Sequence, residues 1–92
     1  MNPFDNSPNP YSIVREEQWS EDINGIHIIY SKSYDAQERV VGVSTRKYRD
    51  GVQIGHFAEY VESDGYWHGG AYDNESGMGC QTYHPFIEGE VQ

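Results

Sequence analysis

Hydrophobic and polar residues alternate along much of the chain, which is the pattern of half-buried β-strands. The clearest case is residues 52–61 (VQIGHFAEYV), in which every second residue from Val52 to Tyr60 falls on one face. Successive side chains of a strand point to opposite faces, so a period of two predicts a strand here. Segments rich in β-branched and aromatic residues predict further strands at 26–34, 39–48, 66–72 and 80–87.

Turn-forming residues separate these segments. Asn24-Gly25 precedes the segment at 26–34 and indicates a two-residue hairpin, because a type I′ turn needs positive φ at both of its central positions. Gly51 and Gly65 each close a further turn sequence that contains an aspartate. The strands are therefore expected to follow one another through short connections.

Four parts of the chain are less regular. The pair Gly69-Gly70 indicates a β-bulge, whereas Pro85 assigns the last strand to an edge of the sheet. Residues 11–19 (YSIVREEQW) match neither period, so a short strand and one or two helical turns are both open. Residues 35–38 (DAQE) form either a polar connection or a single helical turn.

These elements predict one small domain of mainly β structure. About five short strands predict an antiparallel meander that forms a small, partly open barrel or a sandwich. The alternative is an α+β fold with one short helix at 12–19 or 34–40. The domain is expected to span residues 11–88, after a flexible proline-rich arm at 1–10 and before a frayed acidic tail at 89–92.

Composition predicts a folded protein of a reducing compartment. Thirteen of the 92 residues are aromatic, whereas disordered chains are poor in such residues. Cys80 is the single cysteine, so an internal disulfide is excluded. The first residues lack the basic and apolar regions of a signal peptide, and no apolar run approaches a membrane span. We expect a cytoplasmic protein, in the host cytoplasm if a phage encodes it, without a membrane partner.

Charge divides the chain into two unequal parts. All six lysines and arginines lie at or before Arg49, where seven acids reduce the net charge to −1. The remainder, from Asp50 onward, contains eight acids and no lysine or arginine, so it contributes −8 to the total of −9. An acidic surface repels nucleic acid and attracts basic proteins or cations. Direct binding of nucleic acid is therefore not expected.

Acidic and aromatic residues in this second part form the candidate binding site. The hypothesis is that carboxylates from neighbouring strands and turns gather beside aromatic side chains and occupy a basic surface of a larger protein. Carboxylates two residues apart on a strand are separated by about 7 Å, which is close to the spacing of phosphates along a nucleic acid. The predicted partner-binding residues are Glu59, Glu62, Asp64, Asp73, Glu75, Tyr60, Tyr66, Trp67 and Tyr72.

Such a protein would act by competition. By imitating the charge of nucleic acid, it would exclude DNA or RNA from a protein that handles it. In size and charge the chain resembles the small inhibitors that phages use against restriction or CRISPR systems, and the resemblance is one of composition without a shared motif. This resemblance implies a DNA-mimic, antirestriction or anti-CRISPR function through protein–protein interaction. The alternative interpretation of the same acids is an ordinary solvated surface that keeps the protein soluble.

Two further classes of protein remain as alternatives. One is a homo-oligomeric structural or assembly domain, in which the aromatic residues are buried at a symmetric interface; a homodimer is compatible with the small size. The other is a metal-binding domain, because zinc takes nitrogen and sulfur ligands and paired ligands commonly lie two to five residues apart. Its candidate ligands are His56, His68, Cys80 and His84.

Catalysis has little support in the sequence. Cys80 and His84 share a face of their predicted strand, but four residues of a regular strand separate them by about 13 Å. Without a bulge, that distance is too great for a hydrogen bond between a nucleophile and its base. We expect a binding protein without enzymatic activity, without catalytic residues and without a cofactor.

Overall fold

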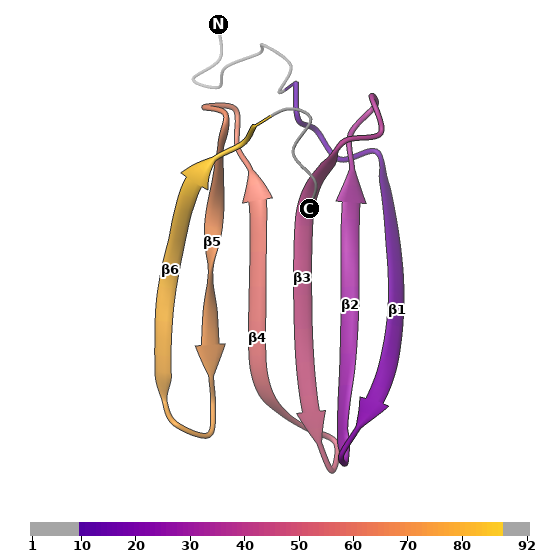
Figure 1. The fold of residues 1–92 in the computed structure, drawn as a ribbon, viewed down its shortest axis with the longest axis vertical. Coiled ribbons are helices and arrows are strands. Elements are labelled where there is room, and N and C mark those ends of the chain that lie inside the picture. Colours follow the sequence, from indigo (N-terminus) through magenta and orange to yellow (C-terminus); the bar gives the residue numbers. More distant parts are fainter. Residues whose placement is uncertain (1–9, 88–92) are drawn as a thin grey trace, which may run out of the picture.

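The chain forms one sheet of six antiparallel strands. The computed structural model describes residues 10–87, and Figure 1 shows them as a ribbon. The strands are β1 (Arg15–Ile23), β2 (Ile26–Tyr34), β3 (Val40–Arg49), β4 (Val52–Val61), β5 (Tyr66–Asp73) and β6 (Met78–Pro85). Their order in the sheet is their order in the chain, so the topology is a meander. The upper end of the sheet in Figure 1 has the β2–β3 and β4–β5 connections, and the lower end has the other three turns.

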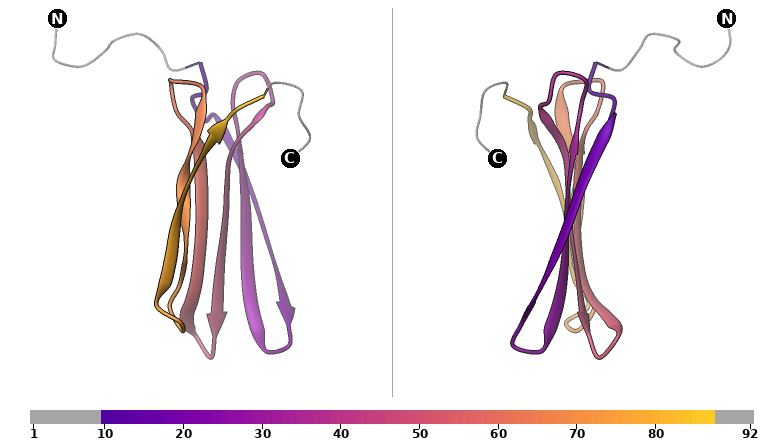
Figure 2. Two further views of the ribbon diagram at one scale, coloured as in Figure 1. Left: turned by 60° about the vertical axis from the view of Figure 1, so that its left-hand side comes forward. Right: turned by 90° about the vertical axis from the view of Figure 1, so that its right-hand side faces the viewer.

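The predicted mainly β meander is confirmed, with one strand more than the predicted five. The additional strand is β1, which includes residues 15–19 of the segment 11–19 whose structure the sequence left open. All nine residues of β1 are exposed. Within residues 10–87 the sheet is a single open layer, as its two side views show (Figure 2), and it neither closes into a barrel nor packs as a sandwich. That part of the chain contains no helix, so the α+β alternative is excluded there. Residues 1–9 of the predicted arm at 1–10 and residues 88–92, which include the predicted tail at 89–92, lie outside the described residues.

Two of the hairpins use the same backbone geometry. Asn24 and Gly25 have φ angles of 52° and 81°, and Asp50 and Gly51 have φ angles of 53° and 80°. Positive φ at both central positions is the property of a type I′ turn, whose twist matches that of the two strands it joins. The sequence prediction of a hairpin at Asn24-Gly25 is therefore confirmed, with Ile23 and Ile26 paired on either side.

Replacement of Asn24 by alanine is expected to destabilise the protein by about 1 kcal/mol, because alanine pays more than asparagine for a left-handed conformation. A domain of this size should then lose roughly 4–8 °C in Tm. Thermal unfolding followed by circular dichroism measures the shift. Ser20→Ala, at an exposed position of β1, is the control and should leave Tm unchanged. Equal Tm values for Asn24→Ala and the unmodified protein would contradict the role of this turn.

Strand register assigns the side chains to two faces. Directly paired residues across the six strands lie on the same face. One such row is Trp19, Tyr30, Thr45, Phe57, Ala71 and Cys80. The face that contains this row, together with Trp67, is called here the tryptophan face. The opposite face is called the tyrosine face, because Tyr60, Tyr66, Tyr72 and Tyr83 lie on it, over strands β4 to β6.

The hydrophobic core is small and lies at the upper end of the tryptophan face. Val41, Val61 and Trp67 form its buried cluster, and Trp67 is 1% exposed. Tyr11 and Phe86 pack on this cluster from the segments that flank the sheet. The rest of the sheet has no comparable cover within residues 10–87. Ile28 is buried there, but many other large apolar side chains in and beside the sheet are exposed. The most exposed of them are Met78, Val52, Val14 and Tyr83.

The two strand glycines Gly69 and Gly70 do not form the expected bulge. Their register with both neighbouring strands is continuous. A Cβ atom at Gly69 would press against the backbone of β4, with the Cα atom of Glu59 only 2.7 Å away. Glycine is therefore required here because two backbones approach closely. Close approach and a β-bulge are both known reasons for glycine inside a strand. The register shifts of the sheet occur instead next to Tyr34 and Tyr48.

Residues 10–87 include no helix with the length and apolar character needed to cross a bilayer.

Candidate partner-binding surface

The tyrosine face is organised in rows that cross β4, β5 and β6. Tyr60 pairs with His68, which in turn pairs with Tyr83, so these three side chains lie beside one another. Tyr66 stacks on Tyr83, with ring centroids 4.7 Å apart and an angle of 3° between the planes. The His68 ring meets the same tyrosine edge-on at 4.8 Å. These contacts hold the exposed rings in fixed positions above the sheet.

Asp64 connects this aromatic cluster to the turn between β4 and β5. Its carboxylate accepts a hydrogen bond from the backbone N–H of Tyr66 at 3.0 Å and lies 2.9 Å from Nε2 of His68. Burial raises the pKa of Asp64, but the Tyr66 N–H and the His68 ring outweigh burial and hold the pKa below its ordinary value. Asp64 therefore remains negative at neutral pH, at the upper rim of the tyrosine face.

The hydroxyl of Tyr83 stays protonated at neutral pH. Desolvation raises its pKa above the ordinary value, and the nearby Asp64 and Tyr66 raise it further. A protonated phenol donates one hydrogen bond and accepts others. With 61% of its surface exposed, Tyr83 offers both an apolar ring and a polar tip to a partner. The sequence interpretation missed this residue, because Tyr83 lies in a different strand from the residues considered and only the register brings it beside Tyr66.

The predicted acidic residues divide between the two ends of the sheet. Glu62 and Asp64 lie at the upper end, whereas Asp73 and Glu75 lie at the lower end, beyond the length of β5. A strand of eight residues spans about 25 Å, so the two pairs do not form one continuous array. Glu75 also pairs with Arg49 at 3.5 Å, which neutralises part of the lower group. Asp73 accepts hydrogen bonds from the backbone N–H groups of Glu75 and Ser76 and shapes the β5–β6 turn.

Trp67 and Glu59 belong to the opposite face and are both buried. Trp67 is part of the core, and Glu59 is 7% exposed. The Glu59 carboxylate lies 3.0 Å from Nε2 of His84, on the far side of β5. Neither side chain is available to a partner without rearrangement of the core. Of the nine predicted residues, the structure therefore brings together Tyr60, Glu62, Asp64 and Tyr66 at the upper end of the tyrosine face, with Tyr72 further down the same face.

The candidate metal ligands do not meet. His56 and His68 lie on the tyrosine face, whereas Cys80 and His84 lie on the tryptophan face. Among residues 10–87, no group of three or more histidine, cysteine, aspartate or glutamate side chains is arranged to hold a metal ion. The described part of the chain therefore offers the metal alternative no ligand set.

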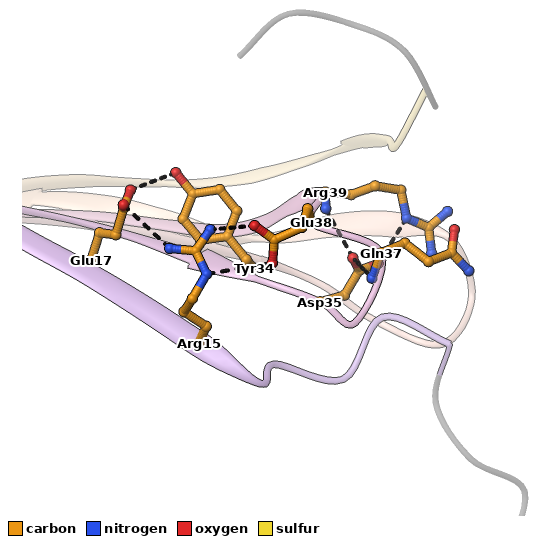
Figure 3. Close-up of polar contacts among 7 residues, drawn as sticks. All are labelled: Arg15, Glu17, Tyr34, Asp35, Gln37, Glu38 and Arg39. Atoms are coloured by element: carbon orange, nitrogen blue, oxygen red, sulfur yellow. Dashed lines mark hydrogen bonds and ion pairs between the residues drawn. The ribbon is translucent and has the colours of Figure 1, made fainter.

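A second charged cluster joins β1 to the β2–β3 connection (Figure 3). Arg15 contacts Glu38 at 2.7 Å and Glu17 at 3.2 Å, and its guanidinium lies 4.0 Å from the centre of the Tyr34 ring. The Tyr34 hydroxyl donates a hydrogen bond to Glu17, which lowers the pKa of Glu17 and raises that of Tyr34. These groups are exposed, so their ion pairs add little to stability. Glu17 and Glu38 thus balance the charge of Arg15 within the protein.

Asp35 organises the β2–β3 connection from a buried position (Figure 3). Oδ1 of Asp35 accepts hydrogen bonds from the backbone N–H groups of Gln37 and Arg39, both at 2.9 Å. Oδ2 accepts one from Nε of Arg39 at 2.7 Å. The Arg39 guanidinium in turn lies over the rings of Tyr11 and Phe86. Asp35 and Arg39 thus neutralise each other where the core is covered.

A shallow hollow of about 620 Å³ lies at the lower end of the tryptophan face. Apolar side chains from four strands line it, among them Ile26, Phe57 and Met78, and Lys47 and Arg49 lie at its side. The hollow is open to solvent.

Comparison of the chain with protein-family models, with curated proteins and with solved structures finds no match in any of the three.

Proposed function

We propose that the protein is a small acidic inhibitor that binds a basic surface of a larger, nucleic-acid-handling protein through the upper end of its tyrosine face. The observation that carries the proposal is that exposed tyrosines and acids lie close together on this surface. They come from the part of the chain after Arg49, which contains no lysine or arginine. Tyr60, Tyr66 and Tyr83 supply the contact area, and Glu62 and Asp64 supply the charge.

The tyrosines suit this role because their positions are fixed in advance. Binding energy is concentrated in a few aromatic or arginine anchors, and ordering a mobile side chain opposes binding. Tyr66 and Tyr83 are already stacked, and His68 supports them from the side. The aromatic cluster therefore loses little conformational entropy when a partner covers it.

The charge suits a competitive mode of action. An acidic surface accelerates association with a basic partner, and salt screens the attraction over a Debye length of about 8 Å at physiological ionic strength. While the inhibitor occupies the basic surface, nucleic acid is excluded from it. This mode of action is that of a phage anti-defence inhibitor, and it places the protein in the host cytoplasm if a phage encodes it. The proposal includes no catalytic step and no cofactor.

The test is capture of proteins from a bacterial lysate on the immobilised protein at low salt, followed by addition of short duplex DNA. Basic nucleic-acid-binding proteins should be captured, and the duplex should release them, because both compete for one surface. A sodium chloride gradient should also release them. Captured proteins that resist both DNA and salt would contradict charge mimicry.

Two variants locate the binding surface. Tyr66→Ala and Glu62→Lys should each weaken binding of the captured partner by about 10-fold or more, since a lost anchor costs more than 1 kcal/mol. The matched controls are Trp19→Ala, which removes an exposed aromatic ring from the opposite face, and Glu16→Lys, which reverses a charge on β1. Both controls should bind as the unmodified protein does. Equal loss in the controls would show that overall charge, and not this surface, determines binding.

A further inference from the structure

The two edges of the sheet differ sharply in charge. β1 contains four acids and one arginine in nine residues, whereas β6 (MGCQTYHP) has no lysine, arginine, aspartate or glutamate. Charged side chains on an edge strand prevent it from pairing with another strand. β1 has this protection and β6 does not, although seven of the eight residues of β6 are exposed.

The hydrogen-bonding groups of β6 that point away from the sheet can be assigned. The N–H of Phe86 donates to the carbonyl oxygen of Gly65 at 2.9 Å, so Phe86 faces inward to β5. In an antiparallel ladder, residues alternate between pairs that are bonded to the neighbouring strand and pairs that are not. Gly79, Gln81 and Tyr83 consequently direct their N–H and C=O groups outward. Pro85, the next in this series, has no N–H and ends it.

We propose that β6 pairs with β6 of a second copy in antiparallel orientation, so that two six-stranded sheets become one sheet of twelve strands. We infer a second copy as the partner because the edge is self-complementary. Gly79, Gln81 and Tyr83 each direct one donor and one acceptor outward, and β6 has no lysine, arginine, aspartate or glutamate whose charge pairing would bury. Head-to-tail pairing of β6 with β1 would instead bring the acids of β1 against the new interface. The symmetric dimer also leaves β1 at both outer edges, where its acids stop further growth.

The arrangement of small and large residues favours a register centred on Gln81. In that register Gln81 lies opposite its counterpart, and Gly79 lies opposite Tyr83 of the second copy. The three pairs make about six main-chain hydrogen bonds. Because Gly79 has no side chain, Tyr83 of the second copy can lie opposite it without a clash and keep its stacking on Tyr66 of its own chain. The tyrosine face then continues across the dimer.

The first test is the mass of the protein in solution, measured by analytical ultracentrifugation at increasing concentration. The expected mass is twice the 10.6 kDa of one chain. Gln81→Pro removes an outward N–H at the centre of the contact and should yield monomers. The matched control is Gln18→Pro in the middle of β1. Its N–H also points outward, because Ile23 and Ile26 form the bonded pair beside the first turn. Gln18→Pro should remain dimeric.

Three results would overturn the proposal. They are a monomeric unmodified protein up to about 1 mM, a dimer that survives Gln81→Pro, and a dimer that Gln18→Pro dissociates. Circular dichroism checks that each variant is folded. If Gln81→Pro does not fold, Gln81→Glu replaces it, because this change keeps the N–H but sets two carboxylates opposite each other. The dimer should then dissociate at pH 7, and a persistent dimer would contradict the pairing.

Cross-linking through Cys80 tests the contact itself. Cys80 is exposed and lies on β6, one residue from the proposed centre. In the proposed register the two Cys80 residues are diagonal neighbours about 7–8 Å apart. A short bismaleimide should therefore link the dimer through these residues at concentrations where the mass is doubled. A dimer that the reagent labels on Cys80 without linking would place the contact elsewhere.

Salt distinguishes this contact from binding of the proposed basic partner. Two chains of net charge −9 repel each other, so added salt should strengthen the dimer. Salt should weaken binding of a basic partner. Dimerisation that weakens with salt would count against pairing at the uncharged edge, whereas failure to capture a partner would leave the dimer unaffected.

Discussion

Gly69→Ala is expected to destabilise the protein by at least about 3 kcal/mol, at the upper end of the range for overpacking, because the new methyl group has only backbone to displace. The added Cβ atom would meet the carbonyl group of Ala58 and lie 2.7 Å from the Cα atom of Glu59. Side chains can change rotamer to relieve such a clash, but these atoms belong to the paired strand β4. The expected fall in Tm is about 12 °C or more.

The control is Gly55→Ala, which places a methyl group at a buried glycine of β4 in the same sheet. There the new Cβ atom would lie 3.6 Å from the nearest atom, the carbonyl oxygen of Tyr72, which is ordinary van der Waals contact. Alanine also restricts the unfolded chain more than glycine does, so Gly55→Ala should be neutral or slightly stabilising. Urea unfolding of both variants measures the difference in the free energy of unfolding. Similar stabilities would show that β5 moves away from β4 without penalty.

Asp35→Ala should have an effect of similar size, a loss of about 3–5 kcal/mol, because it leaves the Arg39 guanidinium without its buried partner. The change also removes the acceptor for two backbone N–H groups. Arg39 lies over Tyr11 and Phe86, which cover the core, so the disturbance reaches the buried cluster. Since small domains are stable by only about 5–15 kcal/mol, the variant should be partly unfolded near its physiological temperature.

The pH dependence of stability distinguishes what the charge of Asp35 contributes to the free energy of unfolding from what its shape contributes. Burial raises the pKa of its carboxyl, but the hydrogen bonds from Arg39 and Gln37 outweigh burial and lower the pKa below the ordinary value. The folded protein therefore binds this proton less tightly than the unfolded chain does. The resulting stabilisation is complete above the unfolded pKa of about 3.9 and is lost as the pH falls through the folded pKa.

Asp35→Asn provides the matching measurement, because it keeps the shape and removes the titration. Its free energy of unfolding should be lower than that of the unmodified protein at pH 7, and the difference should shrink below about pH 4. Asp50→Asn, at an exposed turn position, is the control for the removal of one carboxylate from the protein. A difference between Asp35→Asn and the unmodified protein that stays constant down to low pH would assign the stabilisation to shape alone.

The sequence predicted the fold well because the turns are encoded locally. Asn24-Gly25 and Asp50-Gly51 have few alternatives to a type I′ turn, and the alternation between them leaves little choice of element. β1 was ambiguous because it is exposed on both faces and so has no hydrophobic period. The sequence also could not predict that the strands form a single open layer, because a period of two is the same in a barrel, a sandwich and an open sheet.

The candidate site could be predicted only in part, because it depends on pairing between strands. Tyr60, Tyr66 and Tyr72 are exposed, as a binding role requires, but only the register of β5 with β6 brings Tyr83 to Tyr66. The positions of Trp67 and Glu59 followed from the same register, which turns both toward the core. Asp35 was taken as part of a polar connection, although its buried hydrogen bonds give it a structural role that residue type alone does not reveal.

The identity of chain order and sheet order also bears on how the molecule folds. Each strand contacts mainly its neighbours in the sequence, so every hairpin forms with a short loop closure. Such a sheet has a low contact order for an all-β protein, and folding can begin at any hairpin and spread outward. The buried cluster links β3, β4 and β5, which makes the centre of the sheet the last part to open. β1, exposed on both faces, is the strand most easily released.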